Sequence, residues 1–238
     1  MDLAFIDHMA ANGDTPLHRV SASIKLAASA MLIAAAIVAA TPLTAAAVTA
    51  AVIVLAAVTG QPLRRLAAIA AYPVLFAALF ALGWVRSNAA FAAVIVIRAF
   101  NSGLIAVLLI TTTTFVDVFA VLSRVLPGPV ADGMFMAYRA FFLLFDELGR
   151  VLQAIRLRGG AGPTRAAQLR TYGEAMAVIV IHAADMTERM YRMMTVRGYS
   201  GRIRSSGESS APAPRQYALL IYAAAVLAAQ VALRTRQF

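Results

Sequence analysis

Uncharged hydrophobic runs fill the first half of the chain and return near its end. No charged residue lies between Leu26 and Leu63, and that run is too long for a single membrane crossing of roughly 20 residues. A Thr-Pro-Leu break at 41–43 divides it in two. The hydrophobic pattern predicts transmembrane helices at about 24–40, 43–59, 66–85, 90–113 and 216–233.

The middle of the chain follows a different pattern. Thirteen arginines lie between Arg124 and Arg215, and the apolar residues there recur at helical spacing instead of filling whole windows. Leu-Pro-Gly-Pro at 126–129 ends one helix and begins another, and the Gly-, Ser- and Pro-rich residues 201–215 are typical of a polar linker. This pattern predicts two long helices outside the bilayer.

We therefore predict an all-α fold, a polytopic membrane helical bundle with two long cytoplasmic helices. The expected parts, in chain order, are a cytoplasmic N-terminal segment (1–22), a four-span transmembrane part (23–114), a cytoplasmic part with the two long helices (115–200), the linker (201–215) and a C-terminal transmembrane helix (216–238).

Composition supports the bilayer as the solvent of most of this chain. Hydrophobic residues make up 61% of it, against roughly 45–50% in soluble domains. A formal net charge of +10 is also typical of nucleic-acid binders, but such proteins do not carry so much Ala, Val and Leu, so a basic cytoplasmic surface is the better interpretation. The absence of cysteine excludes disulfides, thiolate metal sites and a cysteine nucleophile.

The distribution of arginines predicts the orientation. Positively charged segments stay in the cytoplasm, which places the Arg-rich middle, Arg64, Arg65 and the N terminus on that side. A single final span then puts the C terminus outside, although the basic tail at 234–238 favours the inside. The alternative is that residues 174–184 cross or re-enter the membrane. We expect no secretory signal peptide, because the first 20 residues lack an apolar core.

Arg98 interrupts the fourth predicted span. A guanidinium is costly in the hydrocarbon region, so it must face protein, water or the membrane surface. Structural pairing inside the bundle is favoured over a role in transport.

Two segments of the cytoplasmic part match when one is shifted by 39 residues. The shift aligns Asp146 with Asp185, Arg150 with Arg189, Arg158 with Arg197 and Gly159 with Gly198. In each copy the aspartate and the first arginine are four residues apart, so we expect them to pair on one helical face. The glycine is a natural C-cap because it takes the left-handed conformation without strain. Each copy therefore predicts a helix that ends in an exposed arginine.

A single Arg-Gly pair is typical of an ordinary helix end, where arginine complements the helix dipole. Two copies that match at four positions favour a function, namely two arginines that dock into equivalent acidic pockets of a partner with twofold symmetry. A pair of ATPase subunits is such a partner. The chain is not an ATPase itself, since it lacks G-x-x-x-x-G-K-[ST]. Arg156, which falls on Thr195, is expected only to support the first motif.

At these residues the sequence resembles the transmembrane T component of energy-coupling factor (ECF) transporters. The signature of that family is a pair of X-Arg-X motifs, commonly Ala-Arg-Gly, at the ends of two cytoplasmic coupling helices. Here the motifs read Leu157-Arg158-Gly159 and Val196-Arg197-Gly198, and both depart from Ala at the first position. The Thr-rich end of a span, the Leu-Pro break, the Tyr-Arg pair and the acidic-Arg helix follow the family's order over about residues 105–200.

The resemblance implies a non-catalytic scaffold subunit in an ATP-driven importer of the bacterial inner membrane. Arg158 and Arg197 are expected to dock in grooves of two ATP-binding cassette ATPase subunits, and the matched Asp and Arg pairs are expected to support the coupling helices. A separate substrate-binding membrane subunit, the S component, and a small accessory membrane subunit are further implied partners. No cofactor is implied.

Within the family, residues 6–26 are most similar to the cobalt/nickel CbiQ-type branch, in which His, Pro and Arg precede a single Lys before the first span. The implied substrate is the cobalt ion, used in cobalamin biosynthesis. Nickel or a vitamin such as biotin, transported within the same family, stays open as an alternative.

We predict no metal site in this chain. His8, His18 and His182 are far apart, and none forms a pair at ligand spacing with another histidine. Ligands for a transported metal are expected in the separate subunit. Asp7 with His8 is the one suggestive cluster, and His182 is expected to be an interior histidine with satisfied hydrogen bonds.

Two other classes of protein were weighed against this interpretation. An integral-membrane enzyme needs a nucleophile paired with a base, and no such pair or Asp-Asp-x-x-Asp signature occurs. A stand-alone secondary transporter needs polar residues or breaks in several spans, and only Arg98 qualifies.

Overall fold

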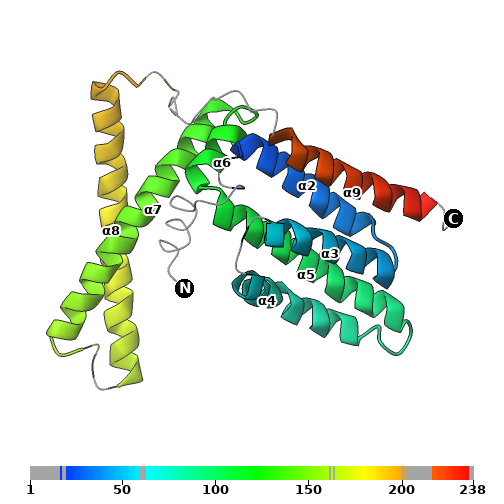
Figure 1. The fold of residues 1–238 in the computed structure, drawn as a ribbon. Coiled ribbons are helices and arrows are strands. Elements are labelled where there is room, and N and C mark those ends of the chain that lie inside the picture. Colours follow the sequence, from blue (N-terminus) through cyan, green and yellow to red (C-terminus); the bar gives the residue numbers. More distant parts are fainter. Residues whose placement is uncertain are drawn as a thin grey trace. The chain divides into compact units, whose positions relative to one another are not determined.

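The computed structural model describes residues 17, 20–58, 60, 63–160, 162, 164–199, 201 and 216–235, with only the backbone for 63–65. The predictions for His8, His18, the side chains of Arg64 and Arg65, and most of the linker lie outside these residues. The described residues form α-helices joined by turns (Figure 1), which confirms the all-α prediction. The chain divides into two compact units, residues 1–121 with 207–238, and residues 122–206.

The first unit contains the apolar helices. They are α2 (Ala22–Val38), α3 (Pro42–Val58), α4 (Leu63–Leu82), α5 (Ala89–Thr112) and α9 (Tyr217–Thr235), and the short α6 (Phe115–Leu122) follows α5. These five bounds agree with the predicted spans to within three residues. By length and composition α5 and α9 can cross a membrane, and α2, α3 and residues 66–82 of α4 are shorter apolar helices. The chain is therefore a helical membrane protein.

Small side chains bring the helices of the first unit together. Its buried residues are mainly alanine and valine, with a few leucines and isoleucines. The closest approach is at Gly103 in α5, where an added Cβ would lie 3.0 Å from the carbonyl oxygen of Ala70 and 3.3 Å from Cγ of Pro73, both in α4. Helices that associate in lipid depend on such close backbone contact, because no hydrophobic driving force separates them from the lipid tails.

Contacts at the helix ends show how the five long helices run. The backbone N–H of Ser21 donates to Oε1 of Gln216 at 3.1 Å, so α2 and α9 begin at the same end of the unit. Nζ of Lys25 donates to the carbonyl of Thr112 at 2.6 Å, so α5 ends there too. The side chain of Gln230 donates to the carbonyl of Thr44 at the opposite end, where α3 begins and α9 finishes. Figure 1 shows this parallel and antiparallel arrangement.

The end of α9 therefore lies at the opposite end of the unit from the start of α2. This is the arrangement in which the N and C termini are on different sides. Residues 174–184, the alternative crossing, lie instead in the middle of a long helix of the second unit. That helix is not among those long and apolar enough to cross a membrane within the described part of the chain.

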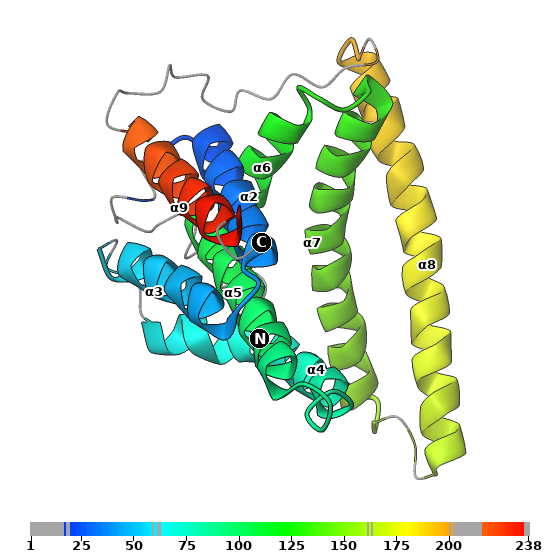
Figure 2. The same cartoon turned by 90° about the vertical axis from the view of Figure 1, so that its right-hand side faces the viewer.

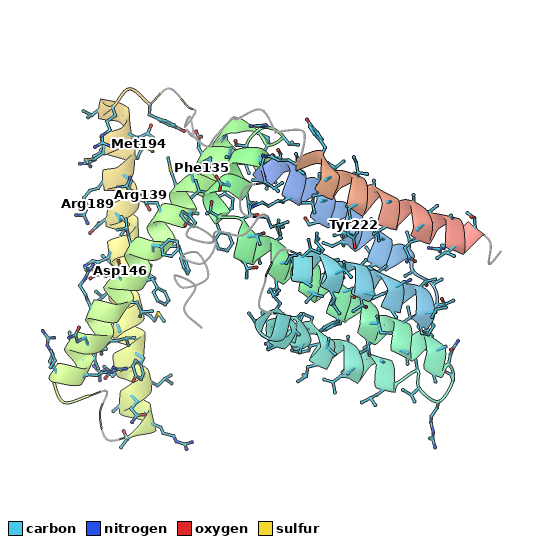
Figure 3. All side chains as sticks on the ribbon, in the orientation of Figure 1. Phe135, Arg139, Asp146, Arg189, Met194 and Tyr222 are labelled. Atoms are coloured by element: carbon cyan, nitrogen blue, oxygen red, sulfur yellow. The ribbon has the colours of Figure 1, made fainter. Side chains whose placement is uncertain are left out.

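Polar side chains inside the first unit bind backbone carbonyls of neighbouring helices. Nε and Nη2 of Arg98 donate to the carbonyl of Ala39, the C-cap of α2, at 3.1 and 2.6 Å. The prediction of a structural role for Arg98 is thus confirmed, since it satisfies a carbonyl that the helix leaves unpaired. Fully buried Asn101 donates to the carbonyl of Ala45 at 3.0 Å, and Tyr222 of α9 donates to the carbonyl of Ala51 at 2.8 Å (Figure 3).

Candidate coupling site at two helix tips

The second unit is built on two long antiparallel helices, α7 (Gly128–Leu157) and α8 (Arg165–Val196). Proline in the first turn of α7 suits a position that needs no N–H donor. The Thr164 side chain caps α8 by accepting a hydrogen bond from the N–H of Ala167 at 3.2 Å. The helices cross in Figure 1 and lie side by side in Figure 2.

Both helices end in the same backbone motif. At the end of α7 the N–H of Gly160 donates to the carbonyl of Ile155 at 3.0 Å, and the N–H of Gly159 donates to that of Arg156 at 3.4 Å. At the end of α8 the N–H of Tyr199 donates to the carbonyl of Met194 (Figure 3) at 3.0 Å, and that of Gly198 to Thr195 at 3.1 Å. These are the two bonds of a Schellman motif, and Arg158 or Arg197 is the C-cap residue in each.

The Schellman motif explains the glycine in each copy. Gly159 has φ +99° and Gly198 φ +81°, in the left-handed region that the sequence predicted. A Cβ at either position would meet nothing within 4 Å, so backbone conformation and not space selects glycine. The repeat at a shift of 39 residues is thus a repeat of three-dimensional structure as well as of letters.

We expect Gly159→Val and Gly198→Val each to loosen the adjoining tip. A β-branched residue resists positive φ, so the last turn should fray, whereas Gly159→Asn should keep the motif because asparagine tolerates this conformation. The chain has no cysteine, so a single cysteine at position 156 or 195 can carry a nitroxide whose mobility is read by electron paramagnetic resonance. Gly149→Val, at an exposed helical position with open space around it, is the control. Equal nitroxide mobility in all variants would contradict the expectation.

The tips present arginine beside an apolar side chain. Arg158 and Arg197 are both exposed. The residues before them are exposed too, to 81% for Leu157 and 88% for Val196. These are the positions at which the chain departs from alanine, and the larger side chains are accommodated because nothing within the second unit covers them.

The two tips lie at opposite ends of the second unit, because α7 and α8 are antiparallel. Glu147 and His182 mark their contact, with Oε1 and Nδ1 3.2 Å apart. Arg158 follows Glu147 by 11 residues and Arg197 follows His182 by 15. At a rise of 1.5 Å per residue the arginines are roughly 40 Å apart along the unit. The arrangement therefore offers two similar cationic tips to two separate sites.

The predicted ion pairs between Asp146 and Arg150 and between Asp185 and Arg189 are not what the structure contains. Nε of Arg150 donates to Oε2 of Glu147 at 2.9 Å, and Nε of Arg189 donates to the backbone carbonyl of Asp185 at 3.3 Å. An aspartate side chain is too short to span the rise of about 6 Å between residues four apart, whereas glutamate reaches further. Figure 3 labels Asp146 on α7 and Arg189 on α8.

Glu147 joins the two helices at their crossing. Its carboxylate contacts Arg150 on α7 and His182 on α8. The hydrogen bond from Arg150, first, and the charges of Arg150 and His182 lower the pKa of Glu147 below its usual value. The His182 side chain is 47% exposed, which corrects the prediction of an interior histidine. The reason is that α8 turns only part of its apolar surface toward α7.

A groove beside the crossing is lined by small and flexible side chains. Its residues are Met136, Ala137 and Ala140 of α7 and Ala184, Thr187, Glu188, Met190 and Tyr191 of α8. Alanines let two helices approach closely, and methionine adapts its shape at low cost. The contact between the helices is therefore suited to a change in their crossing angle.

Sequence reasoning missed a second contact between the helices. The hydroxyl of Tyr199, just after the second tip, donates to Oδ2 of Asp132 near the start of α7 at 2.6 Å. Asp132 is only 3% exposed. No signal in the sequence pairs these residues, because they are 67 positions apart and the shift of 39 aligns neither with its equivalent.

The described residues contain no group of three or more His, Asp or Glu side chains placed to hold a metal ion. The geometry of the site is that of a docking surface: two exposed, similarly capped arginines on a pair of crossing helices.

Comparison with known proteins identifies the same part of the chain. Residues 76–208, more than half of the sequence and including both tips, match the family model of CbiQ, cobalt transport protein. The "Cobalt transport protein CbiQ" of Rhodobacter capsulatus is 29% identical over 185 residues, which cover 72% of this chain and 75% of that protein. These matches confirm the resemblance found from the motifs at 105–200. The chain belongs to the CbiQ family.

Proposed function

We propose that this chain is the transmembrane coupling subunit of an ATP-driven ECF-type importer, and that cobalt ion is the substrate. In this proposal Arg158 and Arg197 dock in one groove on each of two ATP-binding cassette ATPase subunits. The observation that carries it is the pair of helix tips with one backbone motif and one exposed arginine each. Two similar tips suit a partner with twofold symmetry.

The composition of each tip supports docking. An exposed arginine can form charge-assisted, bidentate hydrogen bonds with carboxylates of a partner. Exposed Leu157 and Val196 beside the arginines would be buried in the same contact and would exclude water from the ion pairs. Desolvation makes such pairs stronger than an ordinary surface salt bridge.

The crossing of α7 and α8 suits the transmission of motion. Closure of an ATPase dimer on ATP would bring its two grooves closer together. The tips would follow, and α7 and α8 would rotate about the contact at Glu147 and His182, where alanines and methionines line the groove. This rotation would reach a separate substrate-binding membrane subunit, the S component.

The same proposal places the chain as a multi-pass protein in the bacterial inner membrane. Residues 1–22, the coupling-helix part at 115–200 and the linker at 201–215 would be cytoplasmic, and the helices of 23–114 and 216–238 would cross the bilayer. The odd number of long helices in the first unit supports a C terminus on the other side. A small accessory membrane subunit completes the proposed complex.

Cobalt is proposed because the matching family and the Rhodobacter capsulatus relative carry that name. The ligands for the ion belong, in this proposal, to the S component and not to this chain. Nickel and a vitamin are the substrates against which cobalt is tested.

An uptake experiment tests the proposal. Cells that produce this chain together with candidate ATPase and substrate-binding subunits should accumulate ⁵⁷Co²⁺, and cells lacking any one of the three should not. Unlabelled Co²⁺ should compete more effectively than Ni²⁺ or biotin. The tagged chain should purify with both membrane and ATPase subunits.

Three outcomes would contradict parts of the proposal. Accumulation by this chain alone, without ATPase subunits, would make it a secondary transporter. Stronger competition by Ni²⁺ or biotin would replace cobalt as the substrate while keeping the coupling role. Purification of an active transporter in which this chain does not contact the ATPase would overturn the coupling role itself.

A further inference from the structure

The second tip has an anchor that the first tip lacks. Tyr199 completes the Schellman motif of α8 with its backbone N–H, and its hydroxyl donates to Oδ2 of Asp132 at 2.6 Å. At the first tip the same place in the motif is taken by Gly160, which has no side chain, and positive-φ Gly162 follows. Arg197 is thus held at a fixed place against the start of α7, whereas the loop after Arg158 has no equivalent tie through this position.

The acceptor of the anchor is well placed to hold it. Asp132 is almost completely buried and lies in the second turn of α7, where the positive end of the helix dipole still favours a carboxylate. Its hydrogen bond raises the pKa of Tyr199, so the hydroxyl keeps its proton and remains a donor at neutral pH. A hydrogen bond to an ionised acceptor is stronger than one between neutral groups.

The chemistry of the anchor suits a positioning role. Two residues separate Arg197 from Tyr199, and both ends of this short segment are fixed: one by the last turn of α8, the other by Asp132. A long, flexible arginine binds more tightly when the backbone that carries it is already in place, because less conformational entropy is lost on docking.

We propose that Asp132 and Tyr199 are positioning residues for Arg197, and that they make the two coupling tips unequal. The Arg197 tip moves together with the start of α7, and the Arg158 tip turns on its glycine loop. The inference rests on the proposed docking of Arg197 to an ATPase subunit.

The test measures the affinity of purified ATPase subunits for the complete membrane complex in nanodiscs. Tyr199→Phe removes only the hydroxyl, and Asp132→Asn keeps an acceptor but removes the charge. We expect Tyr199→Phe to weaken ATPase binding roughly three- to tenfold, and Asp132→Asn to weaken it less. Tyr172→Phe, an exposed tyrosine at the other end of α8, is the matched control and should have no effect.

Combination with the tip variants separates positioning from general stability. In an Arg197→Ala background Tyr199→Phe should add nothing, whereas in an Arg158→Ala background it should keep its full effect. The melting temperature in detergent should be nearly unchanged. Equal effects in both backgrounds, or a melting temperature that falls in parallel with binding, would show a merely structural contact and overturn the inference.

Failure of the inference and failure of the proposed function give different results. If Arg158→Ala and Arg197→Ala both leave ATPase binding intact, the docking role is wrong and the inference goes with it. If those two variants weaken binding but Tyr199→Phe and Asp132→Asn do not, the docking role stands and only the positioning role is rejected.

Discussion

The double variant Arg158→Ala/Arg197→Ala should insert into the membrane normally and yet lose its ATPase subunits and its transport activity. Removing one partner of a desolvated charge pair costs about 2–5 kcal/mol, and each 1.4 kcal/mol is a factor of ten in affinity. Each single variant should therefore bind the ATPase at least roughly 30-fold more weakly, and the double variant should fall below detection. Co-purification and ⁵⁷Co²⁺ uptake measure the two effects.

Arg156→Ala is the matched control for this loss. Arg156 is an exposed arginine two residues from Arg158, it lies in the last turn of α7, and the second copy has threonine at its place. It removes the same charge from the same surface, so a general electrostatic attraction would suffer equally. If Arg156→Ala weakens ATPase binding as much as Arg158→Ala does, net charge and not docking of a particular side chain explains the association.

The substitution Gly103→Leu should prevent the first unit from folding stably. Its Cβ alone would stand 3.0 Å from the carbonyl oxygen of Ala70, so the whole side chain has no space between α5 and α4. Overpacking typically costs about 1–3 kcal/mol, and here backbone rather than a flexible side chain must move. We expect a lower yield of membrane-inserted protein and a melting temperature lower by several degrees in a thermal-shift assay in detergent.

Gly149→Leu provides the comparison, because it adds the same atoms to an exposed helical glycine of α7 with nothing within 4 Å. It should leave the melting temperature unchanged or raise it slightly, since leucine favours helix over glycine. Gly103→Ala should lie between the two. A melting temperature for Gly103→Leu equal to that of the unmodified protein would show that α4 and α5 do not approach as closely as described.

The sequence determined the features that depend on neighbours along the chain. Uncharged runs located the five apolar helices because a helix in lipid needs only its own length and hydrophobicity. The shift of 39 residues located Arg158 and Arg197 at helix ends, and glycine after each arginine identified a left-handed cap. Family membership followed from the same local motifs and was confirmed by the comparisons.

Tertiary structure decided which distant groups meet. Arg98 clearly needed an acceptor, but only the packing of α5 against α2 supplies the carbonyl of Ala39. The preference of Arg150 for Glu147 over Asp146 depends on side-chain reach and on a crossing helix that brings His182 to the same carboxylate. Tyr199 and Asp132 are 67 residues apart, and no local pattern records a bond that exists only when α8 returns antiparallel to the start of α7.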